Sequence, residues 1–577
     1  MLDLVRKARR CIHAQRTAYV DEITGKTLLA WGYKPGGWFG AAIAAADQAR
    51  RAGADEAEIR AAVDRHLPAP AATLRAAGAL AHRLNIAPED ADEIANVAAV
   101  EQHMTELMRV PTVRAGAVMP DACPAGSAPG TIPVGGVVAV ENAIHPGMHS
   151  ADICCSLAVS IFRDLAPKAA LDAAMRLSHF GGGGRPRGEQ LRPPADILSA
   201  FESNPFLKDR VSDAIEHFAT QGDGNHFFFV GRIKSTGDIA LVTHHGSRRP
   251  GALLYKAGTA AAEKFRQKLS PQTPRHNAWI PAETREGEAY WAEMQAIRAW
   301  TKANHFAIHD RVAEALGAKV ADRFWNEHNF IFRKSDGLFY HAKGATPAWS
   351  DFAPDSGGLT LIPLNMAEPI LIARGRNADN GLGFAPHGAG RNLSRTAYLR
   401  RHAGKTEGQL VAEQTKGLDV RFFSGIPDVS ELPGAYKNAA TVRRQIAQYG
   451  LAEIVDEIVP LGCIMAGEWQ RNAPGGAAGG RPRRRARVDS GSALLHPGIL
   501  LSVAFRQWPR CVPPSSPSPP AGRRRTIIPS YHRAVELDHQ SPMRLLAPTG
   551  LRIAMCARCL AHATIAPVPR SVRLPPS

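Results

Sequence analysis

The chain has 577 residues, so it can bury a large hydrophobic core and could hold several domains on length alone. Its formal charge is +17, but residues 472–577 contain sixteen Arg, no Lys and only three acidic residues, and so supply +13 of it. The remaining body carries about +4, which excludes a global positive field; any affinity for nucleic acid has to come from a local patch. No apolar run reaches membrane-spanning length, and the eight cysteines form no regular framework, so we expect a soluble protein of the reducing cytoplasm.

The first hundred residues predict a small helical region. Thr24–Gln102 is mostly composed of helix-forming residues, most clearly in the alanine-rich stretches Gly40–Ala52 and Ala54–His66. Trp38 and Phe39 follow a Pro-Gly-Gly turn, and we expect both to pack this region together.

From Val113 onward the pattern changes to Val- and Ile-rich strands that are broken by glycine and proline. Strands are predicted at Val134–Val140, Leu157–Phe162, Phe227–Val230, Ile239–Thr243, Phe330–Phe332 and Leu359–Leu364. Helical periods are clearest at Gly287–Ala315 and at Thr441–Ile458. No internal repeat is visible, and the pattern predicts a single mixed α/β (α+β) body.

The last hundred residues predict a tail without a packed fold. They are rich in arginine and proline, as at residues 513–520, and show no sustained helical or strand period. The absence of lysine argues against a nucleic-acid-binding arm and favours out-of-frame or read-through translation of GC-rich sequence. The Cys556 and Cys559 pair has no second pair and is not taken as a metal site. We therefore expect a helical region at 1–105, a catalytic domain at 106–471 and a disordered or artefactual tail at 472–577.

Metal-type ligands recur where predicted strands meet loops. The candidates are Asp152, Cys155, His226, His244 and His328. A strand-end histidine alone is more often structural, but the recurrence favours a metal site. One carboxylate, one thiolate and several imidazoles suit Mn²⁺, Co²⁺ or Zn²⁺ better than Mg²⁺, and a bridging thiolate would allow two ions.

The cysteine of this set depends on the local backbone. In a regular strand, alternation places Asp152 and Cys154 on one face, whereas an intervening turn lets Asp152 and Cys155 converge. We favour the turn, with Cys155 as the ligand and Cys154 as a packing residue, although periodicity leaves both arrangements open.

Another motif, at residues 386–395 (PHGAGRNLSR), contains a histidine on a glycine turn followed by two arginines. Such a backbone can approach a phosphate closely, and guanidinium groups can bind its oxygens in a forked geometry. His387 is therefore predicted to be a nucleophile for phosphoryl or nucleotidyl transfer.

Seven short motifs occur in the order seen in the RtcB family of RNA ligases, which this chain resembles from about Met119 to Gly462. They are Asp152-Ile-Cys-Cys155, Gly224-Asn225-His226-Phe227, His244-His-Gly-Ser-Arg248, His328-Asn329-Phe330, His341-Ala-Lys-Gly-Ala-Thr346, His387-Gly-Ala-Gly-Arg391 with Ser394-Arg395, and Ala435-Tyr436-Lys437.

The resemblance implies a ligase that uses GTP and a pair of Mn²⁺ ions to join RNA ends bearing a 3′-phosphate or 2′,3′-cyclic phosphate to 5′-hydroxyl ends. It implies that the metal ligands are Asp152, Cys155, His226, His244 and His328. It implies that His387 attacks the α-phosphate of GTP and becomes guanylylated. The nucleotide-binding residues it implies are Asn225, His226, Phe227, Asn329, Pro363, Leu364, Asn365, Met366, His387, Gly388, Ala389 and Gly390. Arg248, Lys343 and Arg391 are the residues expected to bind RNA or nucleotide phosphates.

The chain departs from the family pattern mainly around the guanine pocket. Phe229 stands where the family has a glutamate, Asn365 lies in place of a serine, and a C-terminal lysine is absent near Met465. Because the ligands and the nucleophile are kept, we interpret the chain as a divergent ligase that serves RNA repair. Two alternatives are a metal-dependent phosphoesterase or nuclease and a non-catalytic RNA-binding paralogue.

Overall fold

The computed structural model describes residues 22–68, 70–349, 356–469, 544–546 and 552–554. The chain divides into two compact units, Met1–Arg485 and Ala486–Ser577, which are considered separately. In the second unit the described residues form the antiparallel strands β18 (Arg544–Leu546) and β19 (Arg552–Ala554). The rest of the predicted tail at 472–577 lies outside the described residues. Among the described helices, none combines the length and the apolar character needed to cross a bilayer.

The predicted helical region at the start of the chain is confirmed for its first part. Its helices are α2 (Gly25–Ala30), α3 (Phe39–Arg51) and α4 (Glu56–Asp64). Asp55 and Glu58 begin α4 with a reciprocal capping box, in which each side chain accepts a hydrogen bond from the other residue's amide. Trp38 and Phe39 pack against the small apolar core that these helices share, as expected.

The next stretch is not helical, contrary to the expectation for Thr24–Gln102. Residues 70–90 are irregular except for β1 (Arg83–Leu84), and helix resumes only at α5 (Ala91–Leu107), where Asp90 accepts a hydrogen bond from the amide of Glu93. The buried face of α5 belongs to the main hydrophobic core of the following body. The proposed domain boundary at residue 105 therefore falls within α5, and it stays a prediction.

Two sheets form the mixed α/β body, and the predicted fold class is confirmed. The first sheet has the order β1-β2-β3-β11-β10, with β2 (Val113–Cys123), β3 (Val134–Val140), β11 (Phe339–Lys343) and β10 (Asn329–Arg333). The larger sheet has the order β13-β14-β17-β6-β7-β5-β9, with β16 paired to β17. Its strands are β13 (Leu359–Pro363), β14 (Ile370–Gly375), β16 (Asp419–Phe422), β17 (Ala452–Met465), β6 (Phe227–Ile233), β7 (Ile239–His245), β5 (Ser156–Phe162) and β9 (Asp322–Glu327). All six predicted strands are present.

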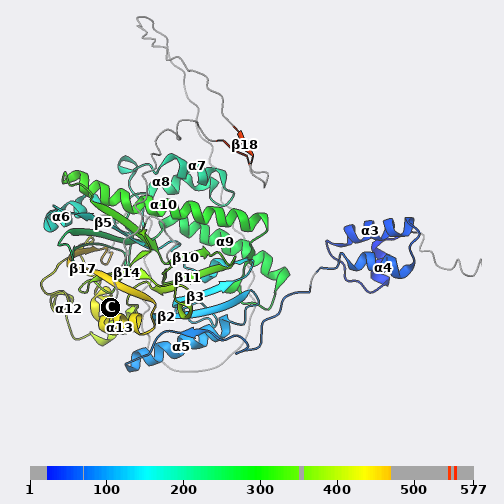
Figure 1. The fold of residues 1–577 in the computed structure, drawn as a ribbon, viewed down its shortest axis with the longest axis horizontal. Helices are drawn as coiled ribbons and strands as arrows, with labels where there is room; N and C mark the ends of the chain where they lie inside the picture. Colours follow the sequence, from blue (N-terminus) through cyan, green and yellow to red (C-terminus); the bar gives the residue numbers. More distant parts are fainter. Residues whose placement is uncertain (1–21, 69, 350–355, 470–543, 547–551, 555–577) are drawn as a thin grey trace, which may run out of the picture. The chain divides into compact units, whose positions relative to one another are not determined.

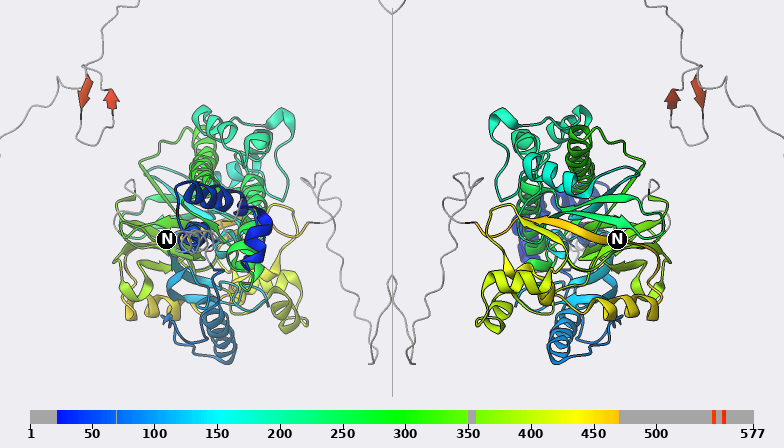
Figure 2. Two further views of the ribbon diagram at one scale, coloured as in Figure 1. Left: turned by 90° about the vertical axis from the view of Figure 1, so that its right-hand side faces the viewer. Right: turned by 90° about the vertical axis from the view of Figure 1, so that its left-hand side faces the viewer.

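Helices cover these sheets and connect them. They are α6 (Pro167–Leu177), α7 (Ala195–Ser203), α8 (Val211–Glu216), α9 (Arg248–Leu269), α10 (Arg285–Ala315), α11 (Arg395–Arg401), α12 (Glu407–Gln414) and α13 (Ala439–Gln448). The long helix α10 contacts both β5 and β7, whereas α5 packs on β2 at the opposite side of the body (Figure 1). The side views show the same layering, with α7 and α8 far from α5 (Figure 2).

Two short strand pairs complete the connections between the sheets. They are β4 (Ala143–Ile144) with β8 (Ile280–Pro281), and β12 (Ala345–Pro347) with β15 (Phe384–Pro386). The second pair matters for the site because it joins the segment after β11 to the segment that carries His387.

The predicted helix at Thr441–Ile458 is wrong in its second half. Asn438 caps α13 by accepting hydrogen bonds from two amides, but the helix ends at Gln448 and Gly450 adopts a positive φ of 61°. The chain then enters β17, which is paired with β14 and β6. Cross-strand pairing on both sides outweighs the weak helical period of this segment.

Candidate metal centre and nucleotide cavity

The five predicted metal ligands come together at one edge of the larger sheet. Asp152 and Cys155 precede β5, His226 precedes β6, His244 lies near the end of β7, and His328 follows β9. Because β6, β7, β5 and β9 are consecutive neighbours in an antiparallel arrangement, these chain segments meet at a common edge.

A tight turn, rather than a regular strand, brings Asp152 and Cys155 together. Cys154 has a φ of 58°, in the left-handed region, and its amide donates to the carbonyl of Asn329 at 2.7 Å. The Cys155 carbonyl accepts from the amide of His328 at 2.9 Å, so the turn is bound to another ligand segment. Cys154 points into the hydrophobic core, as the turn interpretation predicted.

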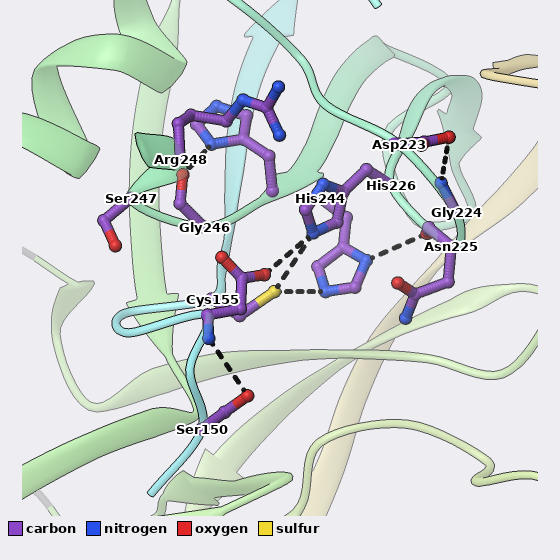
Figure 3. Close-up of polar contacts among 12 residues, drawn as sticks. Ser150, Cys155, Asp223, Gly224, Asn225, His226, His244, Gly246, Ser247 and Arg248 are labelled. Atoms are coloured by element: carbon purple, nitrogen blue, oxygen red, sulfur yellow. Dashed lines mark hydrogen bonds and ion pairs between the residues drawn. The ribbon is translucent and has the colours of Figure 1, made fainter. Parts of the chain in front are cut away.

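The ligand atoms form two overlapping groups of three that share the Cys155 thiol. One group is Cys155, His244 and His328, and the other is Asp152, Cys155 and His226; in each, the ligand atoms lie within 4.8 Å of one another. The Cys155 Sγ is 3.1 Å from Nε2 of His244 and 3.7 Å from Nε2 of His226, so that it contacts both rings (Figure 3). The arrangement fits the bridging thiolate that the ligand types suggested.

Contacts behind the ligands orient them. The Nδ1 of His244 is 3.2 Å from the carbonyl of Asn225, so that nitrogen donates and Nε2 directs its lone pair toward Cys155 and His328 (Figure 3). The Nε2 atoms of His244 and His328 are only 3.2 Å apart. A cation between such facing lone pairs would satisfy them, so the donor set fits a thiophilic divalent metal. Gly246 is needed here because a Cβ would meet the Asp152 carboxylate at 2.0 Å.

The protonation states also suit metal binding. Burial, followed by the charges of His226 and His387, lowers the pKa of His244 to about 3, and burial lowers that of His328 well below its ordinary value. Burial alone would raise the pKa of Asp152, but the hydrogen bond and charge of His226 and the charge of Arg248 lower it to about 2. At neutral pH the imidazoles of His244 and His328 are therefore neutral, and the Asp152 carboxylate is ionised. Burial and the nearby Asp152 charge raise the pKa of the Cys155 thiol, and a bound cation would favour its thiolate.

His387 lies beside this centre and is held by a buried carboxylate. Its ring centroid is 4.8 Å from that of His328. Its Nδ1 is 2.5 Å from Oδ2 of Asp121, and its backbone amide donates to the same oxygen at 3.1 Å. Asp121 is fully buried, whereas the His387 side chain is 18% exposed. The contact fixes the proton on Nδ1 and leaves Nε2 free to act as a nucleophile.

A cavity of about 290 Å³ opens next to His387, and the ligand candidate His244 also lines it. Its lining includes most of the predicted nucleotide-binding residues: Asn225, Phe227, Pro363, Leu364, Asn365, Met366, His387, Gly388, Ala389 and Gly390. Gly390 has a φ of 72°, and a Cβ there would lie 2.0 Å from the carbonyl oxygen of Asp121. The glycine turn that the sequence singled out thus lets the His387 segment pack directly on β2.

The remaining predicted residues lie around these features. The Oδ1 of Asn329 accepts from the amide of Gly344, and the Arg248 guanidinium donates to Oγ1 of Thr220 at 3.1 Å. The Nζ of Lys343 is 3.4 Å from the carbonyl of Ile132.

The guanidinium group of Arg391 is already held by contacts within the protein. Its guanidinium contacts a carboxylate oxygen of Glu431 at 3.2 Å and donates to the carbonyls of Ser430 and Leu393. Its binding to phosphate stays a prediction.

Sequence reasoning missed two acidic residues of the site. Asp121 and Glu431 are both almost completely buried, and each contacts a residue of the His387 segment. A signal for Asp121 was present, since an acidic residue within the apolar strand segment 113–123 requires a buried partner. No local sequence pattern indicated a role for Glu431, because Arg391 and Arg395 come into contact with it only in the folded protein.

The fold and the site define a mixed α/β protein with a buried Cys/His metal-binding candidate beside a carboxylate-bound histidine. A family model described as "tRNA-splicing ligase RtcB" matches residues 196–466. The tRNA-splicing ligase RtcB of Thermococcus kodakarensis is 27% identical over 314 residues, which cover 46% of this chain and 64% of that protein. The tRNA-splicing ligase RtcB of Pyrococcus abyssi is 27% identical over 313 residues, which cover 46% of this chain and 34% of that protein. The RNA-splicing ligase RtcB of Mycobacterium tuberculosis is 26% identical over 300 residues, which cover 46% of this chain and 69% of that protein.

The chain is a distant member of the RtcB family. It spans 64% and 34% of the length of the Thermococcus and Pyrococcus proteins. The matched segment contains His226, His244, His328 and His387, whereas Asp152 and Cys155 precede it. The geometry around Cys155 is therefore an independent argument that the N-terminal ligands belong to the same centre.

Proposed function

We propose that the protein is an RNA ligase that joins a 3′-phosphate or 2′,3′-cyclic phosphate end to a 5′-hydroxyl end, and that it serves RNA repair. The observation that carries the proposal is the position of His387, with Nδ1 bound to a buried carboxylate and its ring 4.8 Å from that of a metal-ligand candidate. Such a histidine is oriented for attack by its second nitrogen on a phosphorus atom.

In the proposed reaction, Nε2 of His387 attacks the α-phosphate of GTP, so that an N–P bond forms and pyrophosphate leaves. The nucleotidyl group then passes to the RNA 3′-phosphate, and the 5′-hydroxyl displaces the nucleoside monophosphate to form the phosphodiester. A cyclic phosphate end is first opened by water. Asp121 stabilises the positive charge that develops on the imidazole during the attack.

Asp152, Cys155, His226, His244 and His328 would hold the metal, for which we propose a pair of Mn²⁺ ions. When bound, divalent cations neutralise triphosphate charge and favour in-line displacement. The contact of His244 with the Asn225 carbonyl and the carboxylate of Asp152 beside His226 orient the imidazoles for this role.

Three cations are assigned to phosphate groups in this proposal. Arg248 lies next to Asp152 and lowers its pKa through its charge, which supports a position at the ligand cluster. Lys343 is mostly buried beside Cys123, and Arg391 lines the cavity. Since Arg391 is already held by Glu431, its contribution would depend on a nitrogen that remains accessible from the cavity.

The test is covalent labelling of the full chain. After incubation with GTP and Mn²⁺, intact-mass analysis should show the addition of one nucleoside monophosphate, and His387→Ala should show none. The wild type should also join RNA fragments with 3′-phosphate and 5′-hydroxyl ends. If RNA is cleaved or dephosphorylated under these conditions and no labelled protein forms, the protein is a phosphoesterase rather than a ligase.

A further inference from the structure

The cavity beside His387 has one wall made by alternate residues of two paired strands. Phe229 lies opposite Cys463, and Phe227 opposite Met465, in the antiparallel register of β6 and β17. All four line the cavity, whereas Phe228 between them is buried on the other face of the sheet. Strand alternation thus gives this wall an apolar surface with two aromatic rings.

A second part of the cavity lining is also mostly apolar. It comes from the end of β13 and the start of β14, where Leu364, Met366 and Ile370 line the cavity. Asn365 is the polar residue of this segment, and its Oδ1 already accepts from the amide of Ala367 at 2.9 Å. Asn365 can therefore offer the amide nitrogen Nδ2 to a ligand as a hydrogen-bond donor. A single amide donor can pair with an acceptor on any of the four bases, so it gives little discrimination.

The charged groups of the cavity are bound to one another. Among the described lining residues, Glu431 is the one acidic side chain. It is ion-paired with Arg395, contacts Arg391 at 3.2 Å and accepts from the hydroxyl of Tyr436 at 2.5 Å. A carboxylate with three donors has little capacity left for the N–H groups of a guanine edge. Removing it from these donors would leave the Arg391 guanidinium without its counter-charge, whereas Arg395 would keep its ion pair with Asp428.

The direction of the cavity determines which part of a nucleotide meets these walls. If the proposed function is right, the α-phosphate lies at His387 and the remaining phosphates lie toward His244 and Asn225, which line the same cavity. The nucleoside then extends toward Phe229, Cys463 and Ile370. This step rests on the proposed function.

We propose that this cavity binds the nucleoside by stacking and apolar contact and does not select guanine, so that ATP and pyrimidine triphosphates also label His387. Every base has a π-face, and stacking on aromatic side chains tolerates any of them. Strong discrimination, of 10⁴-fold or more, needs hydrogen-bonding groups that are left unpaired by the wrong ligand, whereas apolar pockets discriminate by roughly 10- to 200-fold. We expect the labelling efficiencies for GTP and ATP to lie within about tenfold of each other.

The experiment measures the rate of His387 nucleotidylation with each of the four ribonucleoside triphosphates and Mn²⁺, separately and in pairwise competition. Comparable rates for GTP and ATP support the proposal. A preference for GTP over ATP of more than about tenfold would overturn it while leaving the proposed ligase intact. If no triphosphate labels the protein, the proposed function itself fails, which is a separate result.

Two variants test whether the aromatic wall is the nucleoside site. Phe229→Leu should lower labelling by about tenfold for GTP and ATP alike, since it removes a stacking surface. Phe228→Leu is the matched control, because it removes a buried ring from the same strand on the other face and should leave labelling unchanged. Equal effects of the two variants, or an effect of Phe229→Leu on GTP alone, would contradict the proposal.

Discussion

Replacing Asp121 with asparagine tests how the buried carboxylate acts on His387. The same Oδ2 accepts from both Nδ1 and the backbone amide of His387, so an amide oxygen can keep both hydrogen bonds and the variant retains the geometry. What it loses is the negative charge opposite the imidazole. A hydrogen bond to a charged group contributes about 1.5–3 kcal/mol, which corresponds to a rate of nucleotidylation that is roughly 10- to 100-fold slower.

Asp121 also interacts with the buried Lys437, so a control variant has to show the effect of losing a negative charge near that lysine. Burial lowers the pKa of this lysine, while the charges of Glu93 and Asp121 raise it, so both acids help to keep it protonated. Glu93→Gln removes the other acid without touching His387, and it should share any loss of thermal stability with Asp121→Asn. Only Asp121→Asn should slow the labelling.

The assay is single-turnover nucleotidylation at saturating GTP and Mn²⁺, followed by intact mass, with thermal unfolding of each variant as a parallel measurement. If Asp121→Asn is labelled at the wild-type rate while it remains folded, the carboxylate has only a structural role and the argument about charge is wrong. Equal slowing by both variants would lead to the same conclusion.

Two further predictions concern metal binding and stability. Cys155→Ala should lower the number of Mn²⁺ ions bound per chain, because the Cys155 Sγ belongs to both ligand groups. Elemental analysis after dialysis measures this number, and the control variant Cys154→Ala should bind as many ions as the wild type. Equal binding by both variants would contradict the shared thiolate. Glu293 is buried on α10 with no hydrogen-bond partner for either oxygen among the described residues, and burial raises its pKa to about 8. Since this pKa is above the usual 4.5, the folded state loses stability as the pH rises from about 4.5 to 8. Glu293→Gln should therefore be more stable than the wild type by on the order of 4 kcal/mol near pH 8 and equal to it below pH 4.5, as measured by denaturant unfolding. The same difference at both pH values would exclude this cause.

The sequence predicted the ligand cluster because each ligand sits where a recognisable strand meets a loop. Strand ends of one antiparallel sheet converge, so His226, His244 and His328 could be placed together without knowing the strand order. The choice between Cys154 and Cys155 was harder to make, since it depends on a left-handed backbone conformation at Cys154 that a non-glycine residue rarely adopts.

The contacts that sequence reasoning missed are long-range in the chain. Asp121 and His387 are separated by 266 residues, and Glu431 lies 40 residues from Arg391. Neither contact follows from a local period or a turn signal, because both arise only when segments that are distant in the chain meet in the assembled fold. The helix expected over Thr441–Ile458 failed for a similar reason, since the pairing of β17 with two neighbouring strands is a property of the assembled sheet.

Strand pairing also explains how the proposed nucleophile and the candidate metal ligands, which come from distant segments, keep a fixed separation. The carbonyl of His328 accepts from the amide of Ala345 at 3.2 Å, and Ala345 is paired with Pro386, the residue before His387. The same histidine segment is held from the other side by Asp121 on β2. Backbone contacts therefore fix the end of the cavity where bonds would form and break, while side chains of β6, β14 and β17 line the end that would receive the nucleoside. Substitutions at Phe229 or Met465 can change how tightly a nucleotide binds without moving His387 relative to His328, whereas a change in the β12–β15 pairing would alter the chemistry for every nucleotide.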